Sequence, residues 1–426
     1  MGYCGGVPRA GQRKPPSDSR LTDHVSIGVL TRVFPPELVD GVVAEAGRRE
    51  RRQRLLPARV VVYYVLALAL FADSAYEEVM RQLVEGLAWE SGWRQSWEVP
   101  TKVAIYKARE RLGREPLELL FRAVAVPLAS ESTRGAFYRG LRLMSIDGTC
   151  LDVADTPSNE EAFGRPGTGR GQGVGAFPQV RMVALAESAT HAICDVALGP
   201  YSSSEKQLAD PLIDGLGKGM LCLADRGFYS FERFQRARRT GAQLLWRVMG
   251  HMLLPREEQL ADGSYLTRVY KSQQDRRARR RGERVRVLDY RLDDPALADE
   301  DQRYRLITTI LDPEQGPAEE LAALYPQRWE LESALDELKT HQRGPRVVLR
   351  SKHPDGVYQE AYGHLCTHYA IRRVMHDAAL QADLVPHRLS FIRSLRAARR
   401  STRTQPGFSP PQPRPRPPAG DRRNPR

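Results

Sequence analysis

The residues best suited to chemistry in this chain stand at helical spacing in its last third: Tyr325, Arg328, Glu332 and Lys339. At about 100° per residue, the last three fall within roughly 60° of Tyr325 on a predicted helix. A guanidinium, a carboxylate and an ammonium on one stripe can bind a phosphate, or they can form a ladder of ion pairs on a solvated helix. The adjoining face is apolar and should seat the helix on a core; it holds Leu324, Leu331, Leu335 and Leu338.

Two aspartates at predicted β-strands favour the phosphate interpretation. The run Met220–Ala224 is apolar without alternation, as in a strand buried on both faces, and Asp225 follows it directly. Asp147 lies in a second predicted strand, residues 141–149, and is followed by Gly148. Open α/β sheets bind their ligands at the carboxyl ends of the strands. A neighbouring strand can therefore bring Asp225 beside Asp147.

Three carboxylates from two strands and a later helix are the ligands that two-metal phosphoryl transfer requires. Two Mg²⁺ ions about 4 Å apart need oxygen ligands that bridge and flank them. One ion activates the attacking oxygen and the other stabilises the leaving oxygen, so no covalent protein nucleophile is needed.

These residues resemble those of a known family, the bacterial insertion-element-4 transposases, whose catalytic domain is an RNase H-like fold with a DDE triad. The family signature is Tyr, two residues, Arg, three residues, Glu, six residues and Lys. Tyr325, Arg328, Glu332 and Lys339 match it without gaps. The segments around Asp147 and Asp225 also look like the family's, and the resemblance extends over about residues 21–375.

The resemblance implies a role for each matched residue. Asp147, Asp225 and Glu332 would hold two Mg²⁺ ions, for which Mn²⁺ can substitute. Arg328 and Lys339 would hold DNA phosphates, and Tyr325 would contact the DNA backbone near the reacting end. The implied partner is double-stranded DNA, both the terminal inverted repeats of the element and the target. Since both ends must be processed together, we expect a homodimer on DNA.

Some nearby residues keep two interpretations open. Arg226, next to Asp225, can contact a phosphate or form an ion pair with a neighbouring acid. Asp152, Asp155 and Asp336 are rival acids. Asp152 falls where the strand should end, and Asp155 lies in a turn-like run before a proline. Asp336, one turn beyond Glu332, is the rival hardest to dismiss.

The stretch between Asp225 and Glu332 is longer than one helix and one strand require, which predicts an insertion. We place it at about residues 250–316, after a strand at 242–248. Three β-rich runs, 265–270, 284–292 and 304–311, indicate a small β-rich subdomain. A dense basic run suggests that it contacts DNA: Arg276, Arg277, Arg279, Arg280, Arg281, Arg284 and Arg286.

The expected fold class is α/β, an RNase H-like mixed sheet flanked by helices, with the insertion before the last catalytic helix and an all-helical N-terminal domain. We place the catalytic domain at residues 138–378 and the helical domain, expected to bind DNA, at 21–130. Residues 60–72 are too short for a membrane span and predict a buried helix. Residues 101–112 predict a helix with Lys102, Tyr106 and Arg109 on one side. It is either a DNA-reading helix or a surface helix with scattered charge.

Composition agrees with a nucleic-acid partner. The net charge is +13 over 426 residues, although part of it lies in a Pro- and Arg-rich C-terminal tail. We expect residues 1–20 and most of 379–426 to be disordered. Residues 1–20 are polar and carry no secretory signal, so we expect a bacterial cytoplasmic, nucleoid-associated protein without a membrane partner.

The sequence therefore predicts a DDE transposase that performs metal-dependent cleavage and strand transfer, in cut-and-paste transposition of its own element. Two alternatives remain: an inactive copy that only binds DNA, and an RNase H-like nuclease that cuts without joining.

Overall fold

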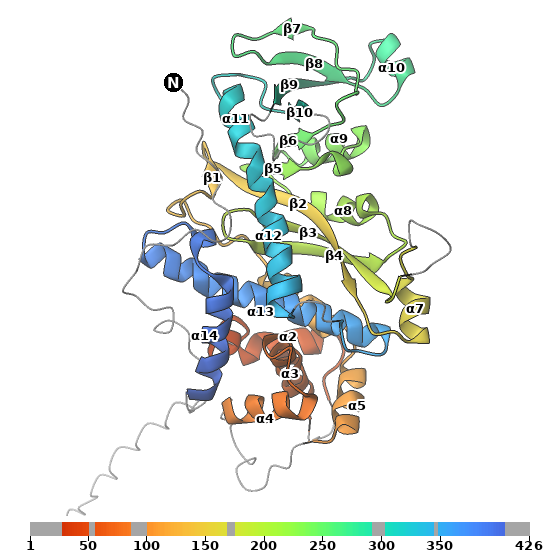
Figure 1. The fold of residues 1–426 in the computed structure, drawn as a ribbon, viewed down its shortest axis with the longest axis vertical. Coiled ribbons are helices and arrows are strands. Elements are labelled where there is room, and N and C mark those ends of the chain that lie inside the picture. Colours follow the sequence, from red (N-terminus) through yellow and green to blue (C-terminus); the bar gives the residue numbers. More distant parts are fainter. Residues whose placement is uncertain are drawn as a thin grey trace, which may run out of the picture.

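The computed structural model describes residues 28–50, 56–86, 100–167, 175–291, 303–344 and 348–404. The predicted N-terminal tail, residues 1–20, lies outside these ranges. The molecule is elongated (Figure 1). Helices from the first third of the chain form one end, a sheet occupies the middle, and the insertion forms the other end (Figure 1).

Five strands form the central sheet in the order β4-β3-β2-β5-β6. Strand β2 is parallel to β5, and β5 is parallel to β6, whereas β3 runs antiparallel to both β2 and β4. Their bounds are Leu141–Asp152 for β2, Gln179–Glu187 for β3, Ala192–Pro200 for β4, Met220–Ala224 for β5 and Gln243–Arg247 for β6. The predicted RNase H-like mixed sheet is confirmed, including the buried strand before Asp225.

The β-rich insertion continues this sheet. Strand β10 pairs antiparallel with β6, and the order runs on through β9, β8 and β7. The bounds are Glu258–Gln259 for β7, Tyr265–Val269 for β8, Glu283–Arg291 for β9 and Arg303–Thr308 for β10, with helix α10 at Gln273–Arg277. The short strand β1, Phe137–Tyr138, pairs with β2.

Helices cover both faces of the sheet, because side chains alternate along each strand. On one face, Met144 and Ile146 of β2 pack with helices α8 (Glu205–Ile213) and α9 (Phe231–Arg239). On the other face, Leu143 packs with α11 (Ala318–Leu324). Helix α12 (Trp329–Asp336) continues α11 along this second face as one rod, and α13 (Pro354–Gln381) lies behind it (Figure 1).

The N-terminal helices share a core with α13. They are α1 (Gly28–Val33), α2 (Pro36–Glu45), α3 (Ala58–Leu70), α4 (Tyr76–Gly86), α5 (Lys102–Leu112) and α6 (Glu115–Val124). Helix α3 is buried along most of its length and packs across α13. Helix α7 (Pro157–Phe163) caps the end of β2. None of the described helices is both long and apolar enough to cross a membrane.

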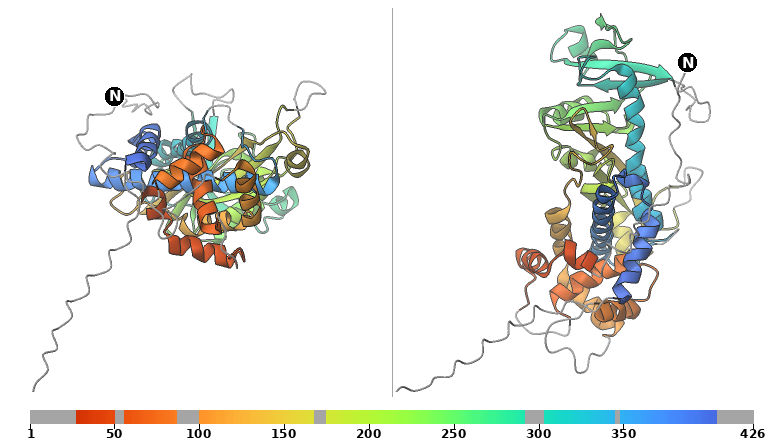
Figure 2. Two further views of the ribbon diagram at one scale, coloured as in Figure 1. Left: turned by 90° about the horizontal axis from the view of Figure 1, so that it is seen from below. Right: turned by 90° about the vertical axis from the view of Figure 1, so that its left-hand side faces the viewer.

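The chain stays folded beyond residue 379, where the sequence predicted a mostly disordered tail. Helix α13 runs to Gln381, and helix α14 spans Phe391–Thr404 (Figure 2). Phe391, Leu395 and Ala398 are buried at helical spacing in the core shared with α13. The prediction was wrong because the segment is rich in arginine and only a narrow stripe of its side chains is apolar. Residues 405–426 lie outside the described part of the chain.

Candidate functional site

Asp147 and Asp225 stand at neighbouring positions on adjacent parallel strands. Ile146 of β2 pairs with Ala224, the last residue of β5, and Asp147 and Asp225 come directly after these two residues. Both are on the alternation that carries Leu143 and the other side chains packed on α11, so both face the α11–α12 rod. The predicted pair of carboxylates is brought together on the helix-covered face of the sheet.

Arg328, directly before helix α12, links these strands to that helix. Its side chain is only 9% exposed. One Nη atom donates to Oδ2 of Asp147 over 3.2 Å, and the other lies 2.8 Å from Oε1 of Glu332. The Glu332 side chain is 53% exposed. A buried guanidinium therefore holds an aspartate from the sheet and a glutamate from the helix on either side of it.

The pKa of Asp147 reflects its burial and the charged groups around it. Its pKa is raised to about 6, chiefly by burial and to a smaller extent by the charges of Glu332 and Asp225. The N–H of Gly148 and the guanidinium of Arg328 act in the opposite direction. Burial is the main cause of the raised pKa, and the two neighbouring carboxylates add to it, so a cation bound here would favour the ionised form of Asp147.

The donor set suits a hard divalent ion, since carboxylate oxygens are the ligands that Mg²⁺ and Mn²⁺ prefer. Within the described ranges, no three Asp, Glu, His or Cys side chains stand close enough together to hold a metal as they are. The exposed side chain of Glu332, now paired with Arg328, is the one that has room to move toward Asp147 and Asp225.

Tyr325 is not on the accessible edge that helical spacing predicted. It belongs to a 3₁₀ turn, Tyr325–Arg328, and packs against Leu143 and Leu221. Its hydroxyl donates to the carbonyl oxygen of Ala224 over 3.3 Å, and burial raises its pKa. The phenol has no surface from which to contact a DNA backbone, so this prediction is corrected: Tyr325 supports the strand that ends at Asp225.

The catalytic helix is also not a uniform α-helix, so its stripe departs from 100° spacing. The 3₁₀ turn precedes α12, and a π-turn, Glu337–Gln342, follows it. π-Turns inside helices occur frequently at functional sites. Lys339 lies in this π-turn and is exposed.

A buried polar network anchors the back of this helix, and the sequence analysis missed it. Nε of Arg372 donates to Glu337 over 2.8 Å, and Nε2 of His368 lies 3.2 Å from the same carboxylate. His191, from the β3–β4 turn, donates to Glu330 over 2.7 Å and lies 3.3 Å from Glu337. Burial would raise the pKa of Glu337, but Arg372 and His191 outweigh it and hold the pKa well below its usual range. Glu330 and Glu337 are seven residues apart, which puts both on the side of the helix opposite Arg328, Glu332 and Lys339. This spacing was the only sign of the network in the sequence.

The rival acids are engaged elsewhere. Asp152 accepts a hydrogen bond from Gln179 over 2.7 Å, and Asp155 forms an ion pair with Arg165. Asp336 lies 3.2 Å from His341. Arg226 is half-buried in the 3₁₀ turn after Asp225, a position compatible with both of its interpretations.

Helix α5 offers DNA a smaller surface than predicted. Arg109 is buried and donates to Gln359 over 3.0 Å and to Ser351 over 2.9 Å, so it joins α5 to α13. Lys102 and Tyr106 remain exposed. The prediction is therefore corrected for Arg109, which has a structural role.

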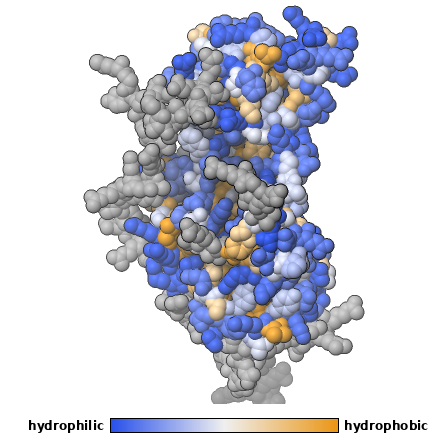
Figure 3. Space-filling model, turned by 45° about the vertical axis from the view of Figure 1, so that its right-hand side comes forward, coloured by the Kyte–Doolittle hydropathy of each residue, from blue (hydrophilic) through white to orange (hydrophobic). Residues whose placement is uncertain are grey.

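The basic run of the insertion also contains both a buried arginine and exposed arginines. Arg286 is fully buried and donates to Ser264 over 2.7 Å and to the carbonyl oxygen of Gly316 over 2.6 Å. It cannot belong to a DNA-facing surface. The exposed members of the run lie around helix α10 and the start of β9, at an end of the molecule that is largely hydrophilic (Figure 3): Arg277, Arg279, Arg280, Arg281 and Arg284.

Two protein-family models together match most of the chain. Residues 24–122 match the family model "Insertion element 4 transposase N-terminal", and residues 138–369 match "Transposase DDE domain". The Escherichia coli (strain K12) protein "Transposase InsG for insertion sequence element IS4" is 31% identical over 384 residues, which cover 88% of this chain and 83% of that protein. A cryo-EM structure of a piggyBac transposase synaptic complex with hairpin DNA aligns with a TM-score of 0.42 and 10% identity, covering 90% of this chain and 78% of that one.

Proposed function

Because this chain belongs to the insertion element 4 family of DDE transposases, we propose that it cuts double-stranded DNA at the terminal inverted repeats of its own element and joins the freed ends to a target. The observation that carries the proposal is that Arg328 contacts both Asp147 and Glu332, while Asp225 lies beside Asp147 at the end of the adjacent strand. A covalent protein nucleophile is not required, since water and then a DNA 3′-hydroxyl can attack the phosphodiester.

Asp147, Asp225 and Glu332 would hold two divalent ions, Mg²⁺ or Mn²⁺, which supply activation of the attacking oxygen and stabilisation of the leaving oxygen. The raised pKa of Asp147 is consistent with this assignment, because a bound cation would offset the burial and the neighbouring acids that disfavour its ionised form. Glu332 has to release Arg328 to join the two aspartates.

Once Glu332 has released it, the guanidinium of Arg328 would be free to bind a phosphate. Arg328 keeps its charge at every physiological pH and lies beside Asp147, so it can donate to the non-bridging oxygens of the phosphate under attack. Lys339, exposed in the π-turn, would hold a neighbouring phosphate, and Arg226 would add a contact beside Asp225. Donors fixed before the reaction stabilise the developing charge without reorganisation.

The exposed arginines around α10 would hold DNA on the insertion side of the site, and the N-terminal helices would bind end sequences. Two ends have to be cut and joined together, which makes a homodimer on DNA the expected assembly.

The test uses a labelled duplex of the inverted repeat that flanks the gene, a plasmid target and Mg²⁺. Wild-type protein is compared with Glu332→Ala and with Asp336→Ala, which removes an acid one turn further along the same helix. Parallel reactions compare Asp147→Ala with Asp152→Ala on strand β2. We expect cleavage and joining in the wild type and in both controls, and neither activity in Glu332→Ala or Asp147→Ala, with end binding preserved.

Each other outcome identifies an alternative. Binding without cleavage in every protein would indicate an inactive copy that occupies DNA. Cleavage without joined products would indicate a nuclease. Full activity of Glu332→Ala or Asp147→Ala would remove that residue from the triad.

A further inference from the structure

Helix α14 lies beyond both matched family segments, the second of which ends at residue 369. Its sequence carries no acidic residue, and arginines are spread along its length. Phe391, Leu395 and Ala398 point into the core. Arg393, Arg396 and Arg400 are exposed, and on an ideal helix they share a stripe roughly 60° wide, opposite the buried side chains.

Helix α14 is fixed against the end of the catalytic helix. Nε of Arg399 donates to the carbonyl oxygen of Leu70 over 2.5 Å, and its Nη2 donates to that of Gln342 over 3.4 Å. The ring of Phe391 lies 5.2 Å from that of His368, and the guanidinium of Arg372 lies 5.6 Å from the Phe391 ring. These contacts reach the π-turn and the network behind it, so α14 is docked as a rigid part of the fold.

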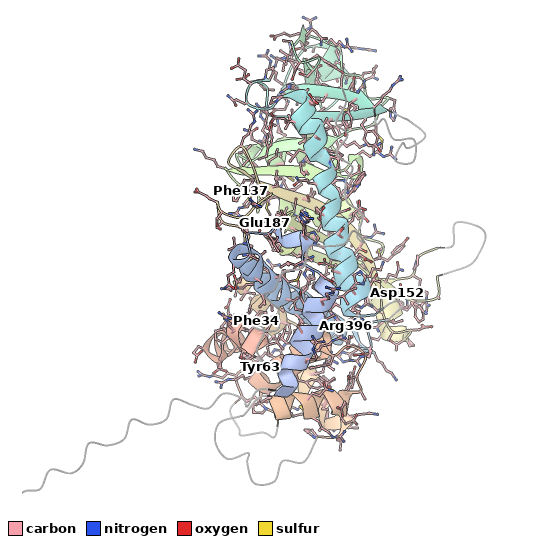
Figure 4. The ribbon with its side chains drawn as sticks, turned by 60° about the vertical axis from the view of Figure 1, so that its left-hand side comes forward. Phe34, Tyr63, Phe137, Asp152, Glu187 and Arg396 are labelled. Carbon is pink, nitrogen blue, oxygen red and sulfur yellow. The ribbon has the colours of Figure 1, made fainter. Side chains whose placement is uncertain are left out.

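The exposed stripe lies close to the proposed DNA path. Gln342 ends the π-turn that carries Lys339, and ten residues of helix separate it from Glu332, a rise of about 15 Å. Figure 4 shows Arg396 on α14 beside the lower end of the catalytic helix. DNA bound at Glu332 and Lys339 would pass within reach of α14.

The stripe carries charge that the folded chain does not neutralise. Across the described ranges, no ion pair or side-chain hydrogen bond engages the guanidinium groups of Arg393, Arg396 and Arg400. By contrast, Arg236 and Arg238 on α9 pair with Asp214 and Glu283. Like charges three and four residues apart destabilise a helix, so an anionic partner would stabilise this stripe.

The side chains of α14 also indicate the class of partner. No large apolar residue of its described part is exposed, and no aromatic ring lies on the arginine stripe. Protein interfaces need a buried apolar centre, and single-stranded nucleic acid is bound by stacking on aromatic rings. A stripe of arginines alone matches the phosphates of a duplex, which carries one negative charge per about 1.7 Å of its axis.

We propose that Arg393, Arg396 and Arg400 bind the backbone of double-stranded DNA and extend the DNA-binding surface beyond Lys339, independently of base sequence. This inference rests on the proposed function, since DNA has to lie along the catalytic helix. It gives the C-terminal segment a role in DNA binding outside the matched transposase regions.

The test compares two triple variants of the full chain. One carries Arg393→Gln, Arg396→Gln and Arg400→Gln. The other carries Arg236→Gln, Arg238→Gln and Arg239→Gln, which removes the same charge from α9 on the opposite face of the sheet. The dissociation constant for an element-end duplex is measured over a range of salt concentrations. Three lost phosphate contacts should reduce the slope of log K against log salt by about 2–3 for the α14 variant, and the α9 variant should keep the wild-type slope.

Two further measurements distinguish a lost DNA contact from misfolding of the glutamine variant. Replacing the three α14 arginines by lysine keeps the charge and should keep the salt slope. A photo-crosslinking residue at position 396, but not one at position 236, should label the bound duplex. Equal slopes for both glutamine variants, or no crosslink from position 396, would overturn the α14 assignment while wild-type cleavage leaves the proposed function standing. Absence of binding and cleavage in the wild type would instead overturn the proposed function, and the α14 inference with it.

Discussion

Arg328 and Asp147 form an ion pair between the 3₁₀ turn that precedes helix α12 and strand β2, 3.2 Å long and largely shielded from water. The same guanidinium holds Glu332. In this arrangement an internal cation occupies the negative region that the family's chemistry would give to metal ions. If Asp147 and Glu332 hold metal ions as proposed, Arg328 would compete with metal for these carboxylates and would lie where the phosphate binds.

The first prediction concerns this competition. Arg328→Gln should bind Mn²⁺ about tenfold more tightly than the wild type, because hydrogen bonds to charged groups contribute roughly 1.5–3 kcal/mol. Cleavage should nevertheless fall by about 100-fold or more, since a donor to the reacting phosphate is lost. Titration calorimetry and a cleavage assay measure the two effects. Arg139→Gln, which breaks an ion pair with Glu320 far from the acids, is the control. Unchanged or weaker Mn²⁺ binding would contradict the competition.

The second prediction follows from the pKa of Asp147, raised from an ordinary 3.8 to about 6. An acid with a raised pKa in the folded state binds its proton more tightly there than in the unfolded chain, so stability falls as pH rises from about 4 through 6. Asp147→Asn should abolish that loss and be more stable than the wild type above pH 6, by up to about 3 kcal/mol. Urea denaturation at pH 5 and pH 7.5 without divalent ions measures this. Equal stability of the two proteins at pH 7.5 would contradict it.

The strand residues of the site could be predicted from the sequence because their environment is local. An apolar run without alternation predicts the buried strand β5, and Asp225 comes directly after that run. The position of Asp225 at the strand end therefore does not depend on how β5 pairs with its neighbours. The gapless signature from Tyr325 to Lys339 gave the helix that faces these strands. Both features depend on neighbours along the chain.

The errors at Arg109, Arg286 and Tyr325 share one cause, which is that burial of polar side chains depends on distant partners. Arg109 and Arg286 read as exposed charge, yet each is buried because Gln359 or Ser264 from a remote segment accepts its hydrogen bonds. Tyr325 turns inward because the carbonyl of Ala224 lies within reach. No period in a single sequence predicts these pairings.

The third prediction tests the inward position of Tyr325. Tyr325→Phe removes one hydrogen bond but keeps the ring, so it should cost about 1 kcal/mol of stability and change affinity for an element-end duplex less than about twofold. Tyr325→Ala should cost about 3–5 kcal/mol, because the ring fills the core beneath the site. Equilibrium unfolding and filter binding measure the two effects. A large loss of DNA affinity in a stably folded Tyr325→Phe protein would restore the phenol as a DNA contact.

The fourth prediction concerns the network behind the catalytic helix. Glu337→Gln leaves Arg372 and His368 buried against a neutral partner, which should cost about 3–5 kcal/mol. Asp336→Asn changes the adjacent exposed acid and should cost less than about 0.5 kcal/mol. Since the network holds the helix by both Glu330 and Glu337, the surviving folded Glu337→Gln protein should also need more Mn²⁺ for half-maximal cleavage.

A double-mutant cycle with Arg372→Gln isolates the interaction between Glu337 and Arg372 from the other contacts of the network. Removing both charges should cost far less stability than the sum of the two single losses. Additive losses would show that Glu337 and Arg372 act separately and that the helix is held by packing alone.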